Sequence, residues 1–209
     1  MSRRPRRWRR YDDEWAEPEG GSKRSRLERM RRGVYLLPAL ITLGNFAAGF
    51  AAILFAIEGR FTGACHLLML SMVCDALDGA MARITHTESK FGKEFDSLAD
   101  VVSFGVAPAI ILFVRFGLSA HPYWIFPLFY ATAGALRLAR YNAMDSDNFD
   151  KYFRGTPIPA PAGMIVGLVL ALEETPQIVV DKRLLIATIL ALSYLMVCNV
   201  RYPSLRVVY

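Results

Sequence analysis

The stretch D-A-L-D-G-A-M-A-R-I-T-H-T-E-S-K-F-G-K-E-F-D-S-L-A-D, from Asp75 to Asp100, decides the fold of this chain. Its aspartates form two pairs, Asp75 with Asp78 and Asp96 with Asp100, and each pair adjoins an apolar run. A charged carboxylate at the centre of a membrane helix costs about 2.5–3.5 kcal/mol on insertion scales. Four carboxylates in such surroundings therefore predict a compensating partner.

Helical spacing predicts that these carboxylates meet. Residues three or four apart share one face of a helix, and this spacing holds within each aspartate pair. The first pair shares its face with Gly79 and Ala82, which leave room for a bulky group beside the carboxylates. The polar stretch from His86 to Phe91, followed by Gly92, predicts a turn that folds the two helices back antiparallel. All four carboxylates would then face one another.

Carboxylates gathered in this way predict a site for divalent cations. Aspartate oxygens are hard ligands that suit Mg²⁺, Mn²⁺ or Ca²⁺. Two carboxylate pairs could hold two ions about 3.5–4 Å apart, an arrangement that serves phosphoryl transfer. Arg83, at the end of the first of these helices, carries a planar group of donors that suits phosphate.

These spacings resemble the pattern of a known family. The pattern D-x2-D-G-x2-A-R-x8-G-x3-D-x3-D is matched without a gap by Asp75, Asp78, Gly79, Ala82, Arg83, Gly92, Asp96 and Asp100. It resembles the CDP-alcohol phosphotransferases, integral membrane enzymes of phospholipid synthesis, and the resemblance covers about residues 34–206. Within that family the chain is similar to the CDP-diacylglycerol–serine O-phosphatidyltransferases. The segments that carry this similarity are F-D-S-L-A-D-V-V-S-F-G-V-A-P-A (Phe95–Ala109), A-L-R-L-A-R-Y-N (Ala135–Asn142) and Y-F-R-G-T-P-I-P-A-P-A (Tyr152–Ala162).

The resemblance implies a reaction and a set of residue roles. A phosphatidyl group would pass from CDP-diacylglycerol to the hydroxyl of L-serine, with release of CMP and with Mg²⁺ or Mn²⁺ as cofactor, as two ions. All four aspartates would bind metal, and Asp100 would also be the general base. The CDP-lipid would be bound by Asp75, Gly79, Ala82, Arg83 and Gly92. The resemblance also implies a homodimer.

The first apolar segment carries Pro38, Thr42 and Asn45 on one helix face. Thr and Asn in such a helix serve either to pack helices together through hydrogen bonds or to line the headgroup pocket. Ala39 follows Pro38 where the resembled group usually has asparagine, which puts one nucleotide contact in doubt unless Asn45 replaces it.

Arg137 and Arg140, one turn apart and followed by Asn142, are the candidates for binding the acceptor. Arginine suits a carboxylate or a phosphate. The alternative interpretation is that both arginines stabilise the helix dipole and mark the cytoplasmic boundary of the membrane.

Composition predicts an all-α, polytopic membrane protein. The chain has 209 residues, 54% of them hydrophobic, and a net charge of +6. Six apolar segments run roughly over 36–57, 61–83, 94–115, 122–142, 157–173 and 183–200, each near the ~20 residues that a bilayer requires. Before them, residues 1–21 predict a disordered charged tail, and 22–33 a basic helix at the membrane surface. The arginine cluster of the tail has no support as a nucleic-acid site, and we expect no such partner.

Lysine and arginine gather on one side of these segments. The other side holds only Arg60, Arg115, Lys182 and Arg183. Because cytoplasmic loops carry the excess of basic residues, we expect both termini and the aspartates on the cytoplasmic side of the cell membrane, the inner membrane where there are two.

Other functions are weighed against this one. The same chemistry could use glycerol 3-phosphate or an inositol compound as acceptor, or an archaeal-type lipid as donor. A cation transporter could use intramembrane acids as an ion path, but these acids gather near one face of the membrane and the sequence has no inverted repeat. A purely structural membrane protein gives no reason for four facing carboxylates.

Overall fold

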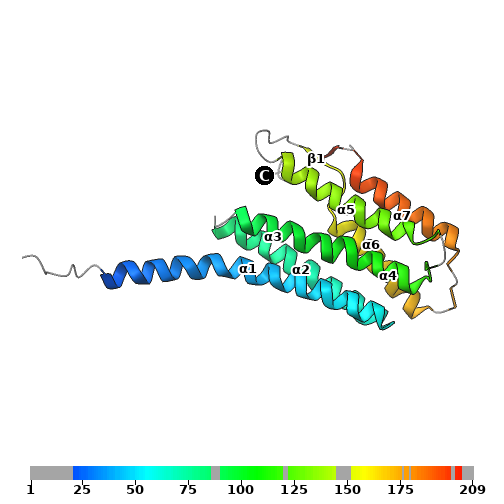
Figure 1. The fold of residues 1–209 in the computed structure, drawn as a ribbon, viewed down its shortest axis with the longest axis horizontal. Helices are drawn as coiled ribbons and strands as arrows, with labels where there is room; N and C mark the ends of the chain where they lie inside the picture. Colours follow the sequence, from blue (N-terminus) through cyan, green and yellow to red (C-terminus); the bar gives the residue numbers. More distant parts are fainter. Residues whose placement is uncertain are drawn as a thin grey trace, which may run out of the picture.

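The computed structural model describes residues 21–85, 90–119, 122–144, 152–175, 177–178, 180–198 and 201–203; of 21–38, 82–85, 90, 144, 152–154 and 201–203 it describes the backbone alone. These residues form a helical bundle with one small two-stranded sheet (Figure 1). The elements are α1 (Gly21–Ile57), α2 (Phe61–Thr85), α3 (Lys90–Asp100), η1 (Val101–Val106), α4 (Ala107–Arg115), α5 (Ile125–Met144), β1 (Tyr152–Arg154), α6 (Pro159–Glu174), α7 (Lys182–Val197) and β2 (Arg201–Pro203). Since α3, η1 and α4 follow one another without a break, the described chain has six helical segments, which confirms the predicted all-α fold.

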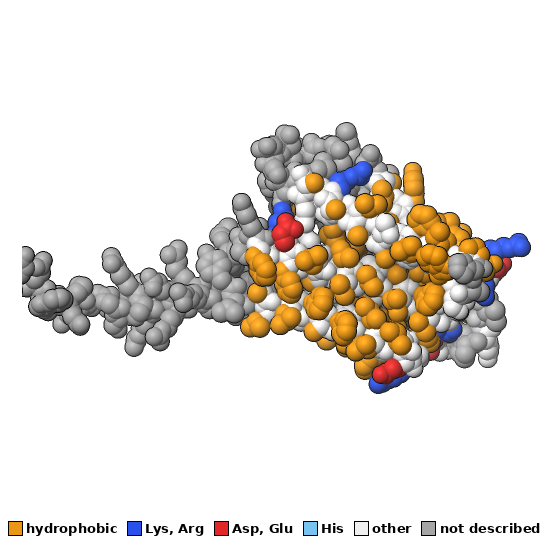
Figure 2. Space-filling view, in the orientation of Figure 1, with side chains coloured by type: hydrophobic (Ala, Val, Ile, Leu, Met, Phe, Trp, Pro, Cys, Tyr) orange, Lys and Arg blue, Asp and Glu red, His pale blue; other side chains and the backbone are white. Residues whose placement is uncertain are grey.

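The bundle has the surface of a membrane protein. Three stretches are long and apolar enough to cross a membrane: Ala39–Ile57, Phe61–Met81 and Phe91–Arg115. Large apolar side chains lie exposed around the bundle, among them Leu54, Leu70, Leu128, Met164 and Tyr194. Figure 2 shows hydrophobic side chains over most of the visible face, with charged side chains toward the two ends of the bundle. The chain is therefore an integral membrane protein with helical spans, as predicted.

Small residues bring α1 and α2 close together. Ala48, Ala52 and Ala56 recur every four residues along α1 and are buried, and Ala64 and Cys65 of α2 are fully buried as well. In a membrane, where lipid is as apolar as the helix surface, close approach of small residues is a main source of helix association. The extensive contact between α1 and α2 fixes the position of α1, against which the rest of the site is built.

The third helical segment, α3–η1–α4, changes from an α-helix to a π-helix at η1. Pro108 gives the physical reason, because proline has no N–H and its ring would clash in an α-helix with the carbonyl four residues earlier. That carbonyl belongs to Phe104, and it accepts a hydrogen bond of 3.1 Å from the buried hydroxyl of Tyr130 on α5. We did not predict this π-helix from the sequence, although Pro108 inside an apolar run signals an irregular turn.

A two-stranded antiparallel sheet joins two distant parts of the chain. β1 pairs with β2 so that Phe153 lies opposite Tyr202. Gly155, which follows β1, has a φ of +77°, and a Cβ there would lie 2.6 Å from the carbonyl oxygen of Met196. The glycine therefore allows the chain to pass close to the end of α7 before α6 begins.

Two expectations on element boundaries need correction. The turn expected over His86–Phe91 and at Gly92 does not extend over Lys90–Gly92, because α3 begins at Lys90 and Gly92 is helical; the other residues of the expected turn lie outside the described part of the structure. The basic stretch 22–33 is helical, but it is the first part of α1 and continues without interruption into the apolar part of that helix (Figure 1). The predicted tail up to residue 20 lies outside the described residues.

Candidate functional site

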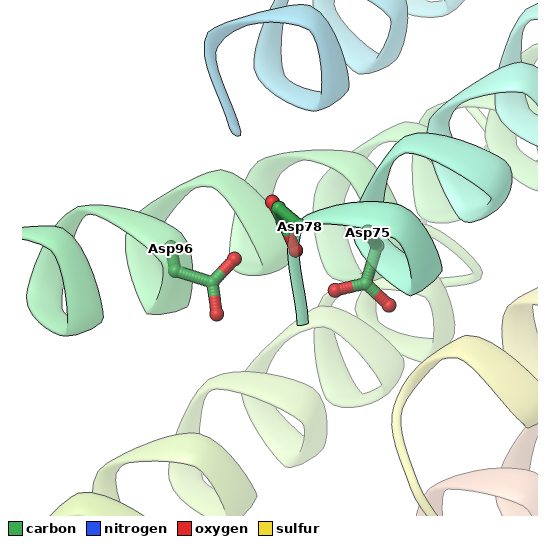
Figure 3. A group of neighbouring side chains, drawn as sticks. All are labelled: Asp75, Asp78 and Asp96. Carbon is green, nitrogen blue, oxygen red and sulfur yellow. The ribbon is translucent and has the colours of Figure 1, made fainter. Parts of the chain in front are cut away.

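Three of the four aspartates converge between α2 and α3. Asp75 and Asp78 come from α2 and Asp96 from α3, and one carboxylate oxygen of each lies within 4.8 Å of the others. Figure 3 shows the three side chains turned toward the space between the two helices. Asp78 is buried, and the other two are half-buried. The spacing of the two pairs in the sequence predicts this arrangement.

Asp100 lies beside this group but is held differently. It is the last residue of α3, it is only 8% exposed, and the other three aspartates are its charged neighbours. Its Oδ1 accepts a hydrogen bond of 3.1 Å from the side-chain amide of Asn45 on α1. All four carboxylates therefore lie together, and Asp100 is in addition hydrogen-bonded to α1.

Helix α1 donates one hydrogen bond to each arm of the hairpin. The hydroxyl of Thr42 lies 3.0 Å from Oδ2 of Asp78 in α2, and Asn45 contacts Asp100 at the end of α3. Both donors are buried. Burying a hydroxyl or an amide without a hydrogen bond costs roughly 2–7 kcal/mol, so each of these contacts also stabilises the packing of α1.

Two serines complete the contacts around Asn45. The hydroxyl of Ser71 on α2 donates to Oδ1 of Asn45, and the hydroxyl of Ser103 in η1 lies 3.1 Å from the backbone carbonyl of Asn45. Both serines are fully buried. The sequence does not single out Ser71 or Ser103, because each is a lone polar residue in an apolar run.

The donor set of the cluster fits a divalent cation. Carboxylate oxygens are the ligands that Mg²⁺, Mn²⁺ and Ca²⁺ prefer. Oδ1 of Asp96 is buried without a hydrogen-bond partner, and no ion pair with a described lysine or arginine involves any of the four aspartates. A cation held by Asp75, Asp78 and Asp96 would satisfy that oxygen and offset the repulsion among the carboxylates.

Gly79, next to Asp78 in α2, is exposed. A Cβ built on this residue would meet no heavy atom within 4 Å, and the use of this space by a ligand stays a prediction. Gly92 is half-buried in the first turn of α3. Ala82 and Arg83 belong to α2, but their side chains lie outside the described part of the structure.

The α5 candidates divide into two groups. The Arg137 guanidinium has Tyr141 and Asp100 as charged neighbours, and its Nε is buried without a hydrogen-bond partner. Asn142 donates to the hydroxyl of Ser97 on α3 at 3.0 Å, and its Oδ1 is likewise buried without a partner. Arg140 instead donates to the carbonyl of Val197 at the end of α7, at 3.3 Å. Arg137 and Asn142 therefore face the carboxylate helices, whereas Arg140 contacts α7.

Comparisons with known proteins agree with this geometry. The chain is 39% identical over 181 residues to the CDP-diacylglycerol–serine O-phosphatidyltransferase of Helicobacter pylori, a match that covers 83% of this chain and 74% of that protein. It is 44% identical over 153 residues to the Mycobacterium tuberculosis protein of the same name, covering 69% of this chain and 53% of that protein. An archaetidylserine synthase from Methanothermobacter thermautotrophicus is 35% identical over 172 residues, covering 80% of this chain and 69% of that protein.

The match to the family extends over nearly the whole described bundle. The sequence profile of the CDP-alcohol phosphatidyltransferases matches residues 35–199, from the apolar part of α1 to just beyond α7. All four clustered aspartates lie inside this range. The chain therefore belongs to the CDP-alcohol phosphatidyltransferase family.

Proposed function

We propose that this chain transfers the phosphatidyl group of CDP-diacylglycerol to the hydroxyl of L-serine and releases CMP. The observation that carries the proposal is the convergence of Asp75, Asp78 and Asp96 next to Asp100. The names of the relatives from Helicobacter pylori and Mycobacterium tuberculosis support serine as the acceptor.

The residues around the cluster suit the parts of this reaction. A divalent cation, Mg²⁺ or Mn²⁺, bound to the three carboxylates would supply positive charge against the pyrophosphate of the donor. Gly79 leaves space for the cytidine side of the donor beside those carboxylates. We expect two ions, with Asp100 contributing a ligand to one of them.

Asp100 is the general base in this proposal. A serine hydroxyl is a poor nucleophile, and a carboxylate within hydrogen-bond reach promotes its attack. The hydroxyl oxygen forms the new bond to phosphorus, its proton passes to Asp100, and the bond from phosphorus to the CMP oxygen breaks. The phosphorus is attacked directly, so no covalent enzyme intermediate is formed.

The acceptor is held between α5 and α3. L-Serine carries a carboxylate, which needs donors, and an ammonium group, which needs acceptors. Arg137 offers a buried donor without a partner, and Asn142 offers a buried acceptor without one. We therefore assign the carboxylate to Arg137 and the ammonium group to Asn142, while Arg140 supports the end of α7.

CMP release tests the reaction directly. Protein purified in detergent is given CDP-diacylglycerol with serine, glycerol 3-phosphate or inositol phosphate, each with and without Mn²⁺ or Mg²⁺. We expect release that requires both serine and the metal. Release with glycerol 3-phosphate in place of serine would refute serine as the acceptor, and a parallel series with an archaeal-type CDP-lipid determines the donor.

A substitution tests the acceptor site. A hydrogen bond to a charged group contributes about 1.5–3 kcal/mol, so Arg137→Ala should raise KM for serine by about 10–100-fold. Arg140→Ala removes the same charge one turn away, and we expect a smaller change in KM. An unchanged serine KM in Arg137→Ala would disprove the assignment.

Membrane orientation and oligomeric state are part of the same proposal. The lysine and arginine bias supports an orientation with the carboxylates and both termini in the cytoplasm. Reporter fusions at the C-terminus and after Arg60 would test it by giving opposite signals. The homodimer implied by the family resemblance stays a prediction, which cross-linking in native membranes would test.

A further inference from the structure

Asn45 is hydrogen-bonded to three other parts of the bundle, through its side chain to Ser71 and Asp100 and through its backbone carbonyl to Ser103. It is fully buried in α1, at the point where α1, α2 and η1 meet. Ser103 already joins η1 to α1 through the backbone carbonyl of Asn45, without using the side chain. The amide side chain is engaged separately, between Ser71 and Asp100. The side chain of Asn45 therefore joins α2 to a carboxylate of the candidate site, a connection that the packing of η1 on α1 does not need.

The chemistry of the neighbours fixes the direction of the amide. An ionised carboxylate only accepts hydrogen bonds, so the NH₂ group of Asn45 must face Asp100. The amide oxygen then faces Ser71, whose hydroxyl donates to it. The hydrogen bonds therefore run in one direction, from Ser71 through Asn45 to Asp100, and they give Oδ1 of Asp100 a buried donor.

We propose that Asn45 is a positioning residue: its side-chain NH₂ group holds Oδ1 of the general base Asp100, so that the Asp100 carboxylate is oriented to take the proton from the acceptor hydroxyl. This inference depends on the proposed function, because it takes Asp100 as the base. It also gives a reason why Asp75, Asp78 and Asp96 form the compact group of possible metal ligands while Asp100 lies beside it. In this proposal Asn45 acts on the reaction from α1, through Asp100, and does not itself contact either substrate.

Kinetics and metal binding together test this role. Substituting the residue that orients a functional group typically lowers activity by about 10–100-fold. We expect Asn45→Ala to lower kcat for CMP release to this extent, with little change in KM for CDP-diacylglycerol. Mn²⁺ affinity, measured by titration of the purified protein without substrates, should fall by much less than kcat, because Asn45→Ala does not touch Asp75, Asp78 or Asp96. The control is Ser193→Ala, a buried serine of α7 whose hydroxyl bonds within its own helix.

A double-mutant cycle separates positioning from a general packing defect. If Asn45 acts through Asp100, Asn45→Ala should cause no further loss of kcat in the Asp100→Asn background. Equal losses in both backgrounds, or a fall in Mn²⁺ affinity and unfolding temperature that matches the fall in kcat, would overturn the proposal. Ser71→Ala serves as a milder variant should Asn45→Ala fail to fold. It should lower kcat in the same non-additive way.

The same variants distinguish failure of this inference from failure of the proposed function. Wild-type kcat in Asp100→Asn would remove Asp100 as the base, and the positioning role would fall with it. Strong loss in Asp100→Asn with wild-type kcat in both Asn45→Ala and Ser71→Ala would leave the base in place and refute the positioning role alone.

Discussion

Replacing Gly49 by alanine should push η1 away from α1. A Cβ at Gly49 would lie 2.7 Å from the Cα of Ser103, and nearer still to the Ser103 hydroxyl. Carbon atoms pack best about 3.5–4.0 Å apart, so the two backbones would have to separate by about 1 Å. The nearest atoms include backbone, and a change of side-chain rotamer therefore cannot relieve the contact.

This displacement should affect activity more than stability. Overpacking of this kind costs about 1–3 kcal/mol, and the advantage of alanine over glycine within a helix returns about 0.5–1 kcal/mol, so the free energy of unfolding should fall by at most about 2.5 kcal/mol. Ser103 lies three residues after Asp100 on the same helical segment, and Asp100 should move with it. Because a misplacement of about 1 Å can slow a reaction about 100-fold, we expect a loss of that size in kcat.

CMP release with saturating CDP-diacylglycerol and serine measures kcat, and thermal unfolding of the same preparation measures stability. Gly44→Ala is the matched control on α1, because a Cβ there would lie 3.7 Å from Sγ of Cys74, an ordinary contact. We expect the control to keep its kcat and to unfold at the same or a slightly higher temperature. If Gly49→Ala kept the kcat of the wild type while unfolding earlier, the coupling of Ser103 to Asp100 would be refuted.

Three further substitutions have outcomes that differ in kind. Gly79→Ala should raise stability by about 0.5–1 kcal/mol, as expected for alanine in a helix, and yet raise KM for CDP-diacylglycerol; an unchanged KM would mean that the donor does not approach Gly79. Thr42→Val removes the hydrogen bond to Asp78 and should weaken Mn²⁺ binding by about 10–100-fold, which titration without substrates would measure. Gly155→Ala should lower stability by more than about 1–2 kcal/mol, since its φ of +77° disfavours a side chain and the carbonyl of Met196 occupies the space of the Cβ; a melting temperature equal to that of the wild type would contradict this.

The meeting of the aspartates was predictable because it depends on local rules. Spacings of three and four residues put Asp75 with Asp78, and Asp96 with Asp100, on one face of each helix. A carboxylate exposed to lipid is costly. When a turn joins two membrane helices, the two aspartate faces are therefore expected to point toward each other. The apolar runs likewise predict the six helical segments. For most of the helix ends, the predicted and the observed boundary differ by only a few residues.

What the sequence did not reveal depends on contacts between distant residues. Pro108 disrupts the α-helical pattern locally, but the hydroxyl of Tyr130, on another helix, is what satisfies the carbonyl of Phe104 and allows a π-helix in that place. In the same way, Asn45 was predicted either to pack helices or to line a pocket, and only its position opposite Asp100 distinguishes these roles. A lone polar residue in an apolar run indicates that a partner exists, but it does not indicate which one.

Helix α1 provides none of the clustered carboxylates, and yet the geometry of the cluster depends on it. The spacing within each aspartate pair is set by its own helix, but the spacing between the pairs has to be set by something that contacts both. Thr42 and Asn45, one turn apart on α1, donate to Asp78 in one arm of the hairpin and to Asp100 in the other. If the hairpin sequence were transplanted without α1, the spacing within each aspartate pair should persist, but the distance between the two pairs should change. The eight residues of the family pattern are therefore not sufficient by themselves to build the site.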